Sequence, residues 1–381
     1  MSLSDANARV DEAVQALLTR AAPGRARFED LVVVPVFAVI VALILGALVM
    51  LATGVDPATV GQSYVALLRG SLGSVNALSE TVTSAIPLVI CGLGLALGFQ
   101  AGLFNIGAEG QLLMGGIAAV IAGFTFAGLP AGLLLPLCLL VGAAVGAAYA
   151  SIAGVLRAVT GAHEVITTIM LNLTSYRILD YLLRLPYVQR EGRSDPISKS
   201  VPDGAGLPRL LSAIDPNLRL HAGVFLMLAC VALVWFVIYR TRLGFEFRAS
   251  GANPDAARYA GIRAGVIIVA AMAAAGALAG LAGANQVLGV LGRASPGFSA
   301  GIGFDAIAVA LLGRSHPVGV LFAGLLFGAL EAGGRQMQVD AGVSVDLIGI
   351  IQSLIIVFIA APLLVRALFP WGFRRNGGGA R

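Results

Sequence analysis

Three polar side chains that could contact a solute lie together where two long apolar runs meet. Asn105, Glu109 and Gln111 fall within the stretch 102–115, at or near the depth of a membrane. A buried carboxylate is costly at that depth unless it is paired or hydrated. Glycines in the same stretch would let the helix break and present backbone groups to a cavity. The alternative is a turn between two helices, in which the charge of Glu109 complements a helix start.

A second acidic side chain, Asp305, lies in another Gly-rich apolar segment, 303–319. We expect the two segments to converge near the middle of the membrane, as discontinuous helices do in transporters. Glu109 and Asp305 would then belong to one polar pathway. The same two carboxylates could instead relay protons, which would make the protein a proton-coupled transporter. Arg177 and Asp180 are three positions apart and are predicted to form an ion pair on one helix.

The other reactive side chains show no pattern typical of a metal site, a cofactor site or an enzyme. The 3 cysteines and 3 histidines are scattered, so we expect no metal and no cofactor. Lys199 is the only lysine, and no Walker A loop surrounds it. Any ATP that drives this protein must therefore bind to another chain. No nucleophile motif of a hydrolase is present, which disfavours an intramembrane enzyme.

The composition is typical of a membrane protein. Hydrophobic residues make up 58% of the 381 residues and charged residues only 12%, whereas soluble chains carry about 25% charged residues. A soluble fold of this length would lack the polar side chains to cover its core. The formal charge of +5 comes from arginines between apolar runs, which indicates membrane topology and disfavours nucleic-acid binding.

Apolar runs recur along the chain at lengths suited to a bilayer of ~30 Å hydrocarbon thickness. We therefore predict an all-α, polytopic integral membrane helical bundle with about ten transmembrane helices. The predicted spans are 31–55, 84–101, 109–127, 130–155, 164–186, 221–239, 265–288, 303–313, 317–333 and 345–368. The runs 303–313 and 317–333 are short, and they fit either two tilted spans or a broken, re-entrant pair.

The distribution of positive charge orients these spans. Basic residues number 15 in the segments assigned to the cytoplasmic side and 3 in the outer segments other than the stretch from Arg184 to Arg219 around the long loop. Both termini are therefore predicted to be cytoplasmic. The expected organisation is a cytoplasmic segment 1–30, a transmembrane domain 31–368 and a cytoplasmic tail 369–381. Apolar residues at helical spacing within 1–30 indicate either a short helix on the membrane surface or a frayed tail.

The loop 187–220 is the only sizeable polar insertion, and it is predicted to be extracytoplasmic. It is rich in Pro, Ser, Gly and Asp and carries charges of both signs. These features fit either a solvated connector or a docking surface for an extracytoplasmic partner, whose orientation the charges would set.

The loop 240–263 is predicted to be cytoplasmic and to contain a short helix. Asn253 can cap free backbone N–H groups and Pro254 suits the first helical position. Gly261 can end the helix a few residues later. Ala256 and Ala257 would give this helix a slim profile, which could fit a groove on a soluble partner. The alternative is a capped loop helix without a partner.

Four stretches, in one order, resemble a known family. They are FNIGAEGQLLMGG from residue 104, and the segments 161–173, 248–262 and 303–319. Together they cover roughly residues 85–335. The chain resembles permease subunits of the bacterial ATP-binding cassette (ABC) importers for branched-chain amino acids, ribose and nucleosides. The nucleoside and simple-sugar branch is the most similar.

This resemblance implies a permease that translocates a small polar solute by alternating access in the bacterial inner membrane. The solute would be a nucleoside, with a simple sugar such as ribose as the alternative. The implied partners are an ABC ATPase, a second homologous permease in a heterodimer, an extracytoplasmic solute-binding lipoprotein and the lipid bilayer. The substrate pathway would include Phe104, Asn105, Glu109, Gln111, Asn172 and Asp305. The ATPase would contact a coupling helix with Gly251, Asn253, Pro254, Ala256, Ala257, Tyr259 and Gly261.

Overall fold

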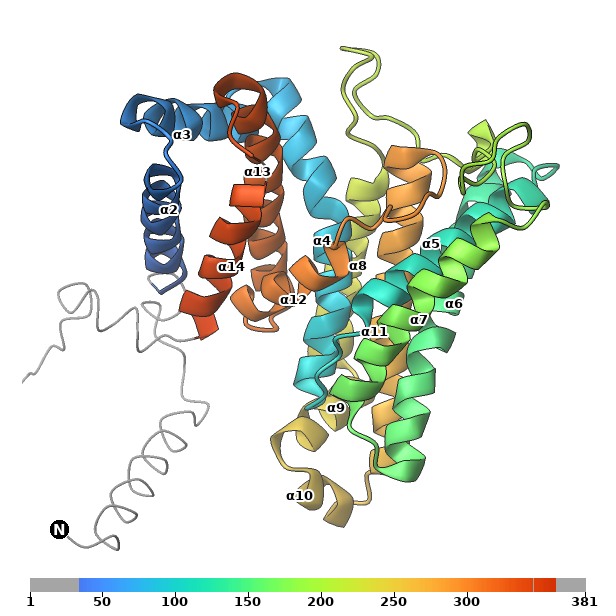
Figure 1. Cartoon of the computed structure of the whole chain (residues 1–381). Coiled ribbons are helices and arrows are strands. Elements are labelled where there is room, and N and C mark those ends of the chain that lie inside the picture. The colour runs from blue at the N-terminus through green and yellow to red at the C-terminus, as the bar shows by residue number, and fades with distance from the viewer. Residues whose placement is uncertain (1–33, 345, 361–381) are drawn as a thin grey trace, which may run out of the picture.

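The computed structural model describes residues 34–344 and 346–360, which form a bundle of helices (Figure 1). The α-helices described are α2 (Val34–Ala52), α3 (Pro57–Leu72), α4 (Val75–Gln100), α5 (Ala108–Thr125), α6 (Ala131–Thr160), α7 (Glu164–Leu183), α8 (Gly223–Arg240), α9 (Arg242–Ala252), α10 (Pro254–Tyr259), α11 (Ala264–Gln286), α12 (Ile302–Leu312), α13 (Pro317–Ala341) and α14 (Asp346–Ala360). Two short turns accompany them, the 3-10 helix η2 (Asp203–Ala205) and the π-helix η3 (Val287–Leu291).

Each of the ten predicted spans overlaps one of these helices. Six of the described helices are long and apolar enough to cross a membrane, namely α4, α5, α6, α8, α11 and α13. Shorter apolar helices occur at Phe37–Ala52, Ile302–Leu312 and Asp346–Ile355. The chain is therefore an all-helical, polytopic membrane protein. The predicted segments 1–30 and 369–381 lie outside the described residues.

Helix α3 was not predicted, and α4 begins nine residues before the predicted 84. The side chain of Asp56 accepts hydrogen bonds from the N–H groups of Ala58 and Thr59 at 2.9 and 3.1 Å, which starts α3. Val60 and Leu67 are buried on one face of α3, which lies across one end of the bundle (Figure 1). An amphipathic helix of this kind contains no continuous apolar run, so a search for apolar spans passes over it.

The segment around α12 crosses the bundle as a broken element. Helix α12 has 11 residues, which gives about 16 Å at 1.5 Å per residue and is too short for a bilayer. Residues 292–301 lead into it without helical structure. At its other end, Gln100 Nε2 at the end of α4 donates to the carbonyl of Ser315 at 3.2 Å. Residues 292–312 thus form one broken element, and α13 follows as a helix of 25 residues.

Glycine allows the two long helices α6 and α11 to touch backbone to backbone. A methyl group at Gly280 would lie 2.3 Å from the carbonyl oxygen of Gly142, and one at Gly276 would lie 2.4 Å from that of Gly146. Neither position can accept a larger side chain without moving a helix. Close backbone packing of this kind is a main source of helix association in lipid, where burial of apolar surface gives no driving force.

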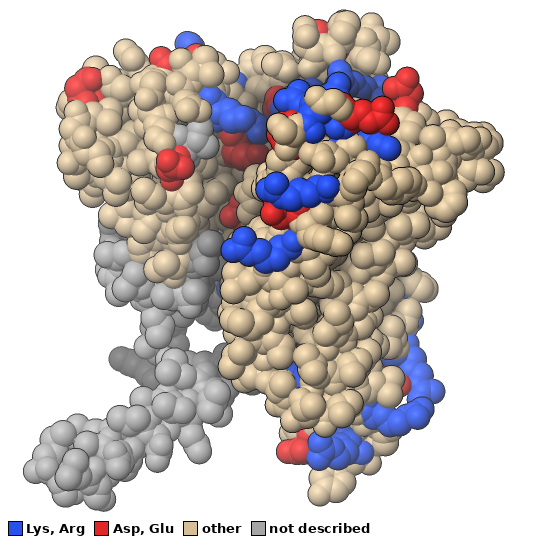
Figure 2. Space-filling view, turned by 45° about the vertical axis from the view of Figure 1, so that its right-hand side comes forward, with Lys and Arg blue, Asp and Glu red and all other residues tan. Residues whose placement is uncertain are grey.

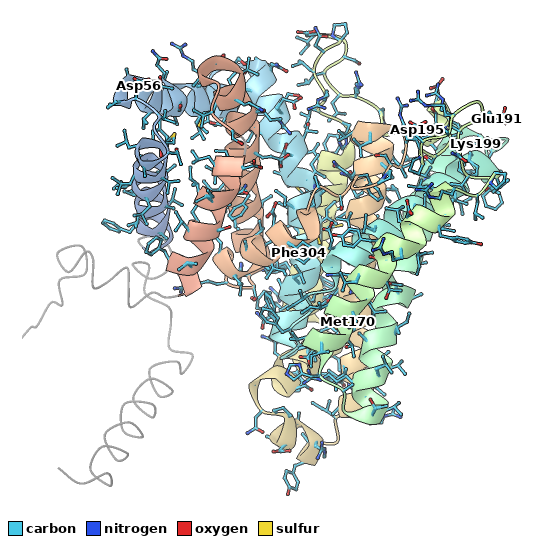
Figure 3. All side chains as sticks on the ribbon, viewed as in Figure 1. Asp56, Met170, Glu191, Asp195, Lys199 and Phe304 are labelled. Atoms are coloured by element: carbon cyan, nitrogen blue, oxygen red, sulfur yellow. The ribbon has the colours of Figure 1, made fainter. Side chains whose placement is uncertain are left out.

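Charged side chains gather at opposite ends of the face shown in Figure 2, with a band of few charges between them. Glu191, Asp195 and Lys199 lie at one end, as does Asp56 (Figure 3). We call this the loop end, after the loop 187–220. Helices α9 and α10 lie at the other, which we call the α10 end (Figure 1). Two polar ends separated by an apolar band are expected of a protein that spans a bilayer.

Candidate functional site

The chain breaks between α4 and α5, and buried amides hold the break. Asn105 Nδ2 donates to Gln111 Oε1 at 3.0 Å, and Gln111 Nε2 donates to Asn105 Oδ1 at 3.1 Å. The same oxygen of Asn105 accepts from the N–H of Gly107 at 2.8 Å. Both amide side chains are buried. They satisfy each other and the backbone that leaves the helix, as buried polar groups must.

Helix α7 presents a polar stripe to this break. Its buried members recur every three or four residues and are Glu164, Thr168, Asn172 and Ser175. Glu164 accepts from the N–H of Phe104 at 3.2 Å, and Thr168 accepts from that of Ile106 at 3.3 Å. Arg157 of α6 pairs with the Glu164 carboxylate. The stripe therefore takes over the hydrogen bonds that a continuous α4–α5 helix would have supplied itself.

Asn172 bonds both a donor and an acceptor of the backbone at this break. Its Oδ1 accepts from the N–H of Gly110 at 2.9 Å, and its Nδ2 donates to the carbonyl of Ile106 at 2.7 Å. Gly110 has no room for a side chain, since a methyl group there would lie 2.9 Å from Asn172 Oδ1. Farther along α7, Asp180 pairs with Arg184 at 3.4 Å. The prediction that it pairs with Arg177 is therefore wrong.

Glu109 joins the α4–α5 break to α12. It lies in the first turn of α5 and is 1% exposed. One carboxylate oxygen accepts from the N–H of Gly303 at 2.8 Å, in the first turn of α12. The other accepts from the hydroxyl groups of Ser299 and Tyr176, the latter at 3.3 Å. A carboxylate is favourable at this place because the first N–H groups of a helix lack partners and carry partial positive charge.

The six predicted pathway residues thus separate into two groups. Asn105, Glu109, Gln111 and Asn172 form one buried network with the backbone, which we call the polar lattice. Asp305 lies partly buried on α12, close to the contact that Glu109 makes. Phe104 is 39% exposed and packs on Phe99 with ring centroids 5.1 Å apart.

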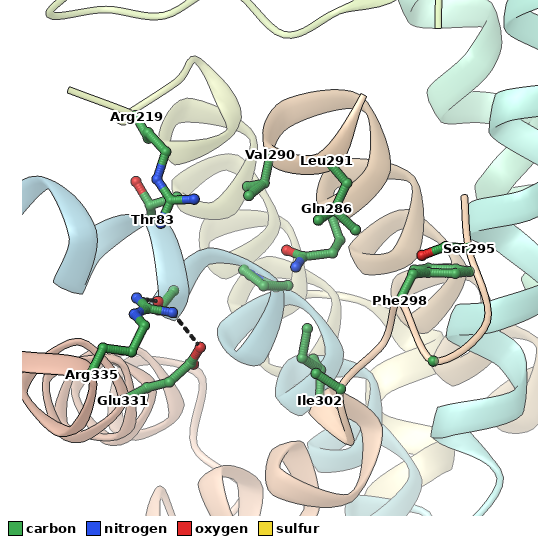
Figure 4. Close-up of a pocket in the computed structure, with 14 residues that line it drawn as sticks. Thr83, Arg219, Gln286, Val290, Leu291, Ser295, Phe298, Ile302, Glu331 and Arg335 are labelled. Atoms are coloured by element: carbon green, nitrogen blue, oxygen red, sulfur yellow. Dashed lines mark hydrogen bonds and ion pairs between the residues drawn. The ribbon is translucent and has the colours of Figure 1, made fainter. Parts of the chain in front are cut away.

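A cavity of about 390 Å³ lies towards the loop end (Figure 4). Its walls come from α4, the end of the loop 187–220, the π-turn η3, the non-helical segment 292–301 and α13. The residues that line it are Thr83, Ser84, Pro87, Arg219, Gln286, Val290, Leu291, Ser295, Gly297, Phe298, Ala300, Ile302, Glu331 and Arg335. None of the six predicted pathway residues is among them. Ala300 and Ile302, however, lie next in sequence to Ser299 and Gly303, which bond to Glu109.

Charged side chains with opposite signs meet at this cavity. Arg335 donates to Glu331 at 3.0 Å, to Ser84 at 2.9 Å and to Glu80 at 3.4 Å. Arg219 also pairs with Glu80, with Nε and Oε1 2.8 Å apart. We call Glu80, Arg219, Glu331 and Arg335 the cavity charge cluster. Arg219, Arg335 and Glu331 line the cavity, and Glu80, which is not part of the lining, pairs with both arginines. The two carboxylates and two guanidinium groups of the cluster therefore balance.

Only part of this cluster could be predicted from the sequence. Glu331 and Arg335 stand four positions apart near an apolar run, which is the spacing of an ion pair on one helix face. Glu80 and Arg219 are 139 positions apart, and nothing local links them. The part of the chain that the structure describes gathers no three His, Cys, Asp or Glu side chains in the way a metal site would.

The loop 187–220 is fastened to the rim of the cavity. On one side the Arg219–Glu80 pair and the bond from Leu220 N–H to Ser79 Oγ, 3.1 Å, hold it to α4. On the other side its backbone bonds to the segment that follows α11. These bonds are Ser198 N–H to the Ala294 carbonyl at 2.9 Å, Val201 N–H to Gly292 at 2.8 Å and Leu207 N–H to Leu288 at 3.0 Å. The loop therefore bridges two walls of the cavity.

A family model described as the permease component of the branched-chain amino acid transport system matches residues 77–360. The chain belongs to this permease family. It is thus a transport subunit of an ABC importer and is not itself catalytic. Membership also implies an ATPase and a binding protein as partners.

Curated relatives match this permease over nearly its whole length. The guanosine ABC transporter permease NupP of Bacillus subtilis is 39% identical over 87% of the chain and 94% of its own length. The nucleoside ABC transporter permease NupB of Lactococcus lactis is 34% identical over 89% and 93%. The glucose ABC transporter permease TsgB13 of the archaeon Haloferax volcanii is 37% identical over 91% and 92%.

A second guanosine permease of Bacillus subtilis, NupQ, also matches this permease, with 26% identity over 66% of the chain and 79% of its own length. One organism can therefore hold two permeases of this family with the same named solute. No solved structure matches the chain significantly.

At the α10 end of the permease, Asn253 starts a short helix as expected. Its side-chain oxygen accepts from the N–H groups of Asp255 and Ala256 at 3.1 and 3.0 Å. Pro254 is the first residue of α10.

Gly261 follows α10 with a φ of +84°, a left-handed backbone conformation that favours glycine. Gly251 of α9 packs on the end of α4, where a methyl group would lie 2.3 Å from the carbonyl of Gln100.

The exposed surface of α10 differs from the expected one. Ala257 is 4% exposed and faces the rest of the chain, whereas Tyr259 is 94% exposed. The chain itself therefore covers Ala257, which cannot form the expected narrow contact with a partner. The surface that α10 offers is built from Pro254, Asp255, Ala256, Arg258 and above all Tyr259.

Proposed function

We propose that this permease moves an uncharged, hydroxylated solute, a nucleoside, through the cavity at the loop end. The observation that carries the proposal is the balance of charge around about 390 Å³ of space, a volume within the ~300–1,000 Å³ typical of small-molecule sites. Guanidinium and carboxylate groups can hydrogen-bond hydroxyl and amide groups. Because each already has a counter-ion, a charged solute would find no unpaired partner.

The named solutes of the relatives support a nucleoside over a sugar. Three of the relatives match nearly the whole chain, and two of them are named for guanosine or nucleosides. One of these two, NupP, has the highest identity of the three. The glucose permease of an archaeon is almost as similar, so a simple sugar is the second candidate. Apolar lining from Pro87, Val290 and Ile302 favours the nucleoside, because a base brings an apolar face that a sugar lacks.

We assign the loop end to the outside and the α10 end to the cytoplasm of a bacterial cell, with the permease in the inner membrane and both termini cytoplasmic. The excess of basic residues in the segments assigned to the cytoplasm supports this orientation. The loop 187–220 would then receive a solute-binding lipoprotein, and α10 would contact the ATPase. The pair NupP and NupQ supports a heterodimer with a second permease.

In this proposal the polar lattice supports the path and does not line it. Glu109 holds the start of α12, and Asn105, Gln111 and Asn172 hold the break between α4 and α5. Irregular backbone at membrane depth is tolerated where it borders a cavity or is buried in protein. The two broken elements can then shift as units during alternating access, because each is held by side chains and not by a continuous helix.

The decisive experiment measures uptake by the complex co-expressed with its ATPase, second permease and binding lipoprotein. We expect ATP-dependent uptake of labelled guanosine that excess unlabelled nucleosides inhibit and glucose does not. Uptake of glucose alone would make the permease a sugar transporter. Uptake that collapses with an ionophore at constant ATP would make it a proton-coupled transporter.

The contact with the ATPase is tested on α10 with two variants. Tyr259→Ala removes the most exposed side chain of α10 and should lower solute-stimulated ATP hydrolysis while leaving the permease folded. Ala257→Arg places a charge in a closed contact and should also lower the melting temperature. Coupling that is unchanged in Tyr259→Ala would remove α10 as the contact.

A further inference from the structure

Two buried side chains near the loop end have polar atoms without partners. His221 and Asn285 are both 0% exposed. His221 Nδ1 accepts from the N–H of Gly223 at 3.1 Å, but Nε2 has no partner among the described residues. Neither amide atom of Asn285 has a partner there either. Buried polar atoms are almost always satisfied, because an unmade hydrogen bond costs free energy that folding does not recover.

These atoms share one recess, which lies against two glycines. A methyl group at Gly223 would lie 2.1 Å from Asn285 Oδ1 and 2.6 Å from His221 Cε1. A methyl group at Gly289 would lie 2.7 Å from His221 Nε2. The imidazole and the amide therefore approach each other between two residues that have no side chain. Donor and acceptor atoms gathered in this way are typical of a site for a polar group.

The recess lies behind one wall of the solute cavity. Gln286 and Val290 line the cavity, and they flank Gly289 along the chain (Figure 4). A second hollow of about 470 Å³ lies on the other side, under the loop, and it shares Val290 and Leu291 with the cavity. The π-turn η3 (Val287–Leu291) is thus a thin partition between two open spaces. Single π-turns are often found at functional sites.

The recess is polar and uncharged. Burial, together with nearby Arg209, lowers the pKa of His221 from 6.5 to about 4, so the imidazole is neutral near pH 7. A neutral imidazole and an amide offer both donors and acceptors. They match a hydroxyl or amide group and would reject an ion.

We propose that His221 and Asn285 form an occluded subsite that hydrogen-bonds an uncharged hydroxyl or amide group of the transported solute when η3 moves aside. The inference rests on the proposed function, in which the adjacent cavity carries that solute. The subsite would be closed in the conformation described and open at one stage of the transport cycle. It would add hydrogen-bond selectivity to the charge balance of the cavity.

The test separates solute recognition from stability. Asn285→Leu keeps the branched shape of the side chain and removes both unpartnered atoms. Because unsatisfied polar atoms are lost, the melting temperature should stay the same or rise. If the amide binds solute, kcat/KM for guanosine uptake by the whole complex should fall roughly tenfold, the loss expected for one or two hydrogen bonds. Thr174→Val, on an exposed face of α7, is the matched control and should change neither quantity.

The other possible results of these measurements also test the subsite. A higher melting temperature with unchanged kcat/KM for both Asn285→Leu and His221→Phe would show that the recess holds water only, and would overturn the proposal. If Asn285→Leu does not assemble, Asn285→Ala takes its place with the same expectation for kcat/KM. The proposed function fails separately, if the wild-type complex moves glucose and not guanosine. The variants are then measured with glucose, whose hydroxyl groups the subsite would also bind.

Discussion

The polar lattice and the cavity charge cluster are both polar regions within a membrane bundle, but they differ in their partners. The lattice side chains Asn105, Glu109, Gln111 and Asn172 are buried, and half of their hydrogen bonds go to backbone groups. The cluster side chains bond to one another beside an open space of about 390 Å³. Partners on the backbone indicate that a side chain shapes the chain, whereas side-chain partners beside a cavity indicate that it meets a solute.

This difference predicts opposite consequences of mutation. Removing a lattice side chain leaves buried backbone groups unpaired, which costs folding free energy. Removing a cluster side chain leaves a charge that water in the cavity can solvate, so folding is affected little. Mutations in the lattice should therefore impair mainly assembly, and mutations in the cluster should impair mainly transport.

The largest effect is expected for Asn172→Leu. This change frees the N–H of Gly110 and the carbonyl of Ile106, each of which costs about 1–3 kcal/mol when buried and unpaired. The yield of the assembled complex and its melting temperature should fall sharply. Asn217→Leu, on an exposed part of the loop, is the matched control. Normal yield and stability of Asn172→Leu would remove the structural role of the lattice.

A smaller effect on folding and a large one on transport are expected for Arg335→Gln. The cavity would lose the partner of Glu331 and one partner of Glu80, and it would then carry excess negative charge. Uptake should fall about tenfold or more, as the loss of a well-placed charged contact does, while the melting temperature stays near that of the wild type. Arg184→Gln, which changes an exposed ion-pair arginine directly after α7, is the control. A fall in stability as large as that of Asn172→Leu would erase the distinction between the two regions.

An intermediate effect is expected for Glu109→Gln, which tests whether the lattice also acts in transport. The amide can still accept from Gly303 and donate to the hydroxyl of Ser299. Only the charge at the start of α12 is lost, which costs about 0.3–2 kcal/mol. The complex should retain its ATPase, with uptake reduced severalfold. Glu109→Leu removes every acceptor and should not assemble. Full uptake by Glu109→Gln would limit this side chain to a structural role.

The smallest effect concerns pH and the recess next to the cavity. The pKa of His221 lies near 4 in the folded protein, below its ordinary 6.5, so the unfolded chain takes up this proton first as the pH falls. Stability due to this group is fully present above pH 6.5 and is lost as the pH falls towards 4. The melting temperature of the wild type should therefore fall more over this window than that of His221→Phe. Parallel curves for the two proteins would show that the imidazole is not buried as described.

The sequence by itself determined most of the helices. Continuous apolar runs placed ten of them, since the length of hydrocarbon to be crossed sets a length of chain. The Gly-rich stretch 102–115 predicted the break around Gly107, because glycine lets a helix end there. The second break was expected between 303–313 and 317–333, whereas the long non-helical stretch is 292–301, before α12. The start of α10 was also predicted from adjacent residues, Asn253 and Pro254. Signals of this kind arise from neighbouring residues, so they survive in the sequence alone.

Tertiary structure decided which polar groups meet. Glu109 and Gly303 are 194 positions apart, and Arg335 and Glu80 are 255 apart. Ala257 and Tyr259 stand in one short helix, yet packing buries the first and exposes the second. Apolar periodicity reports how much of a helix is buried but not against what. Because a polar side chain gains its role from a partner that packing brings near, that role could be read only from the folded chain.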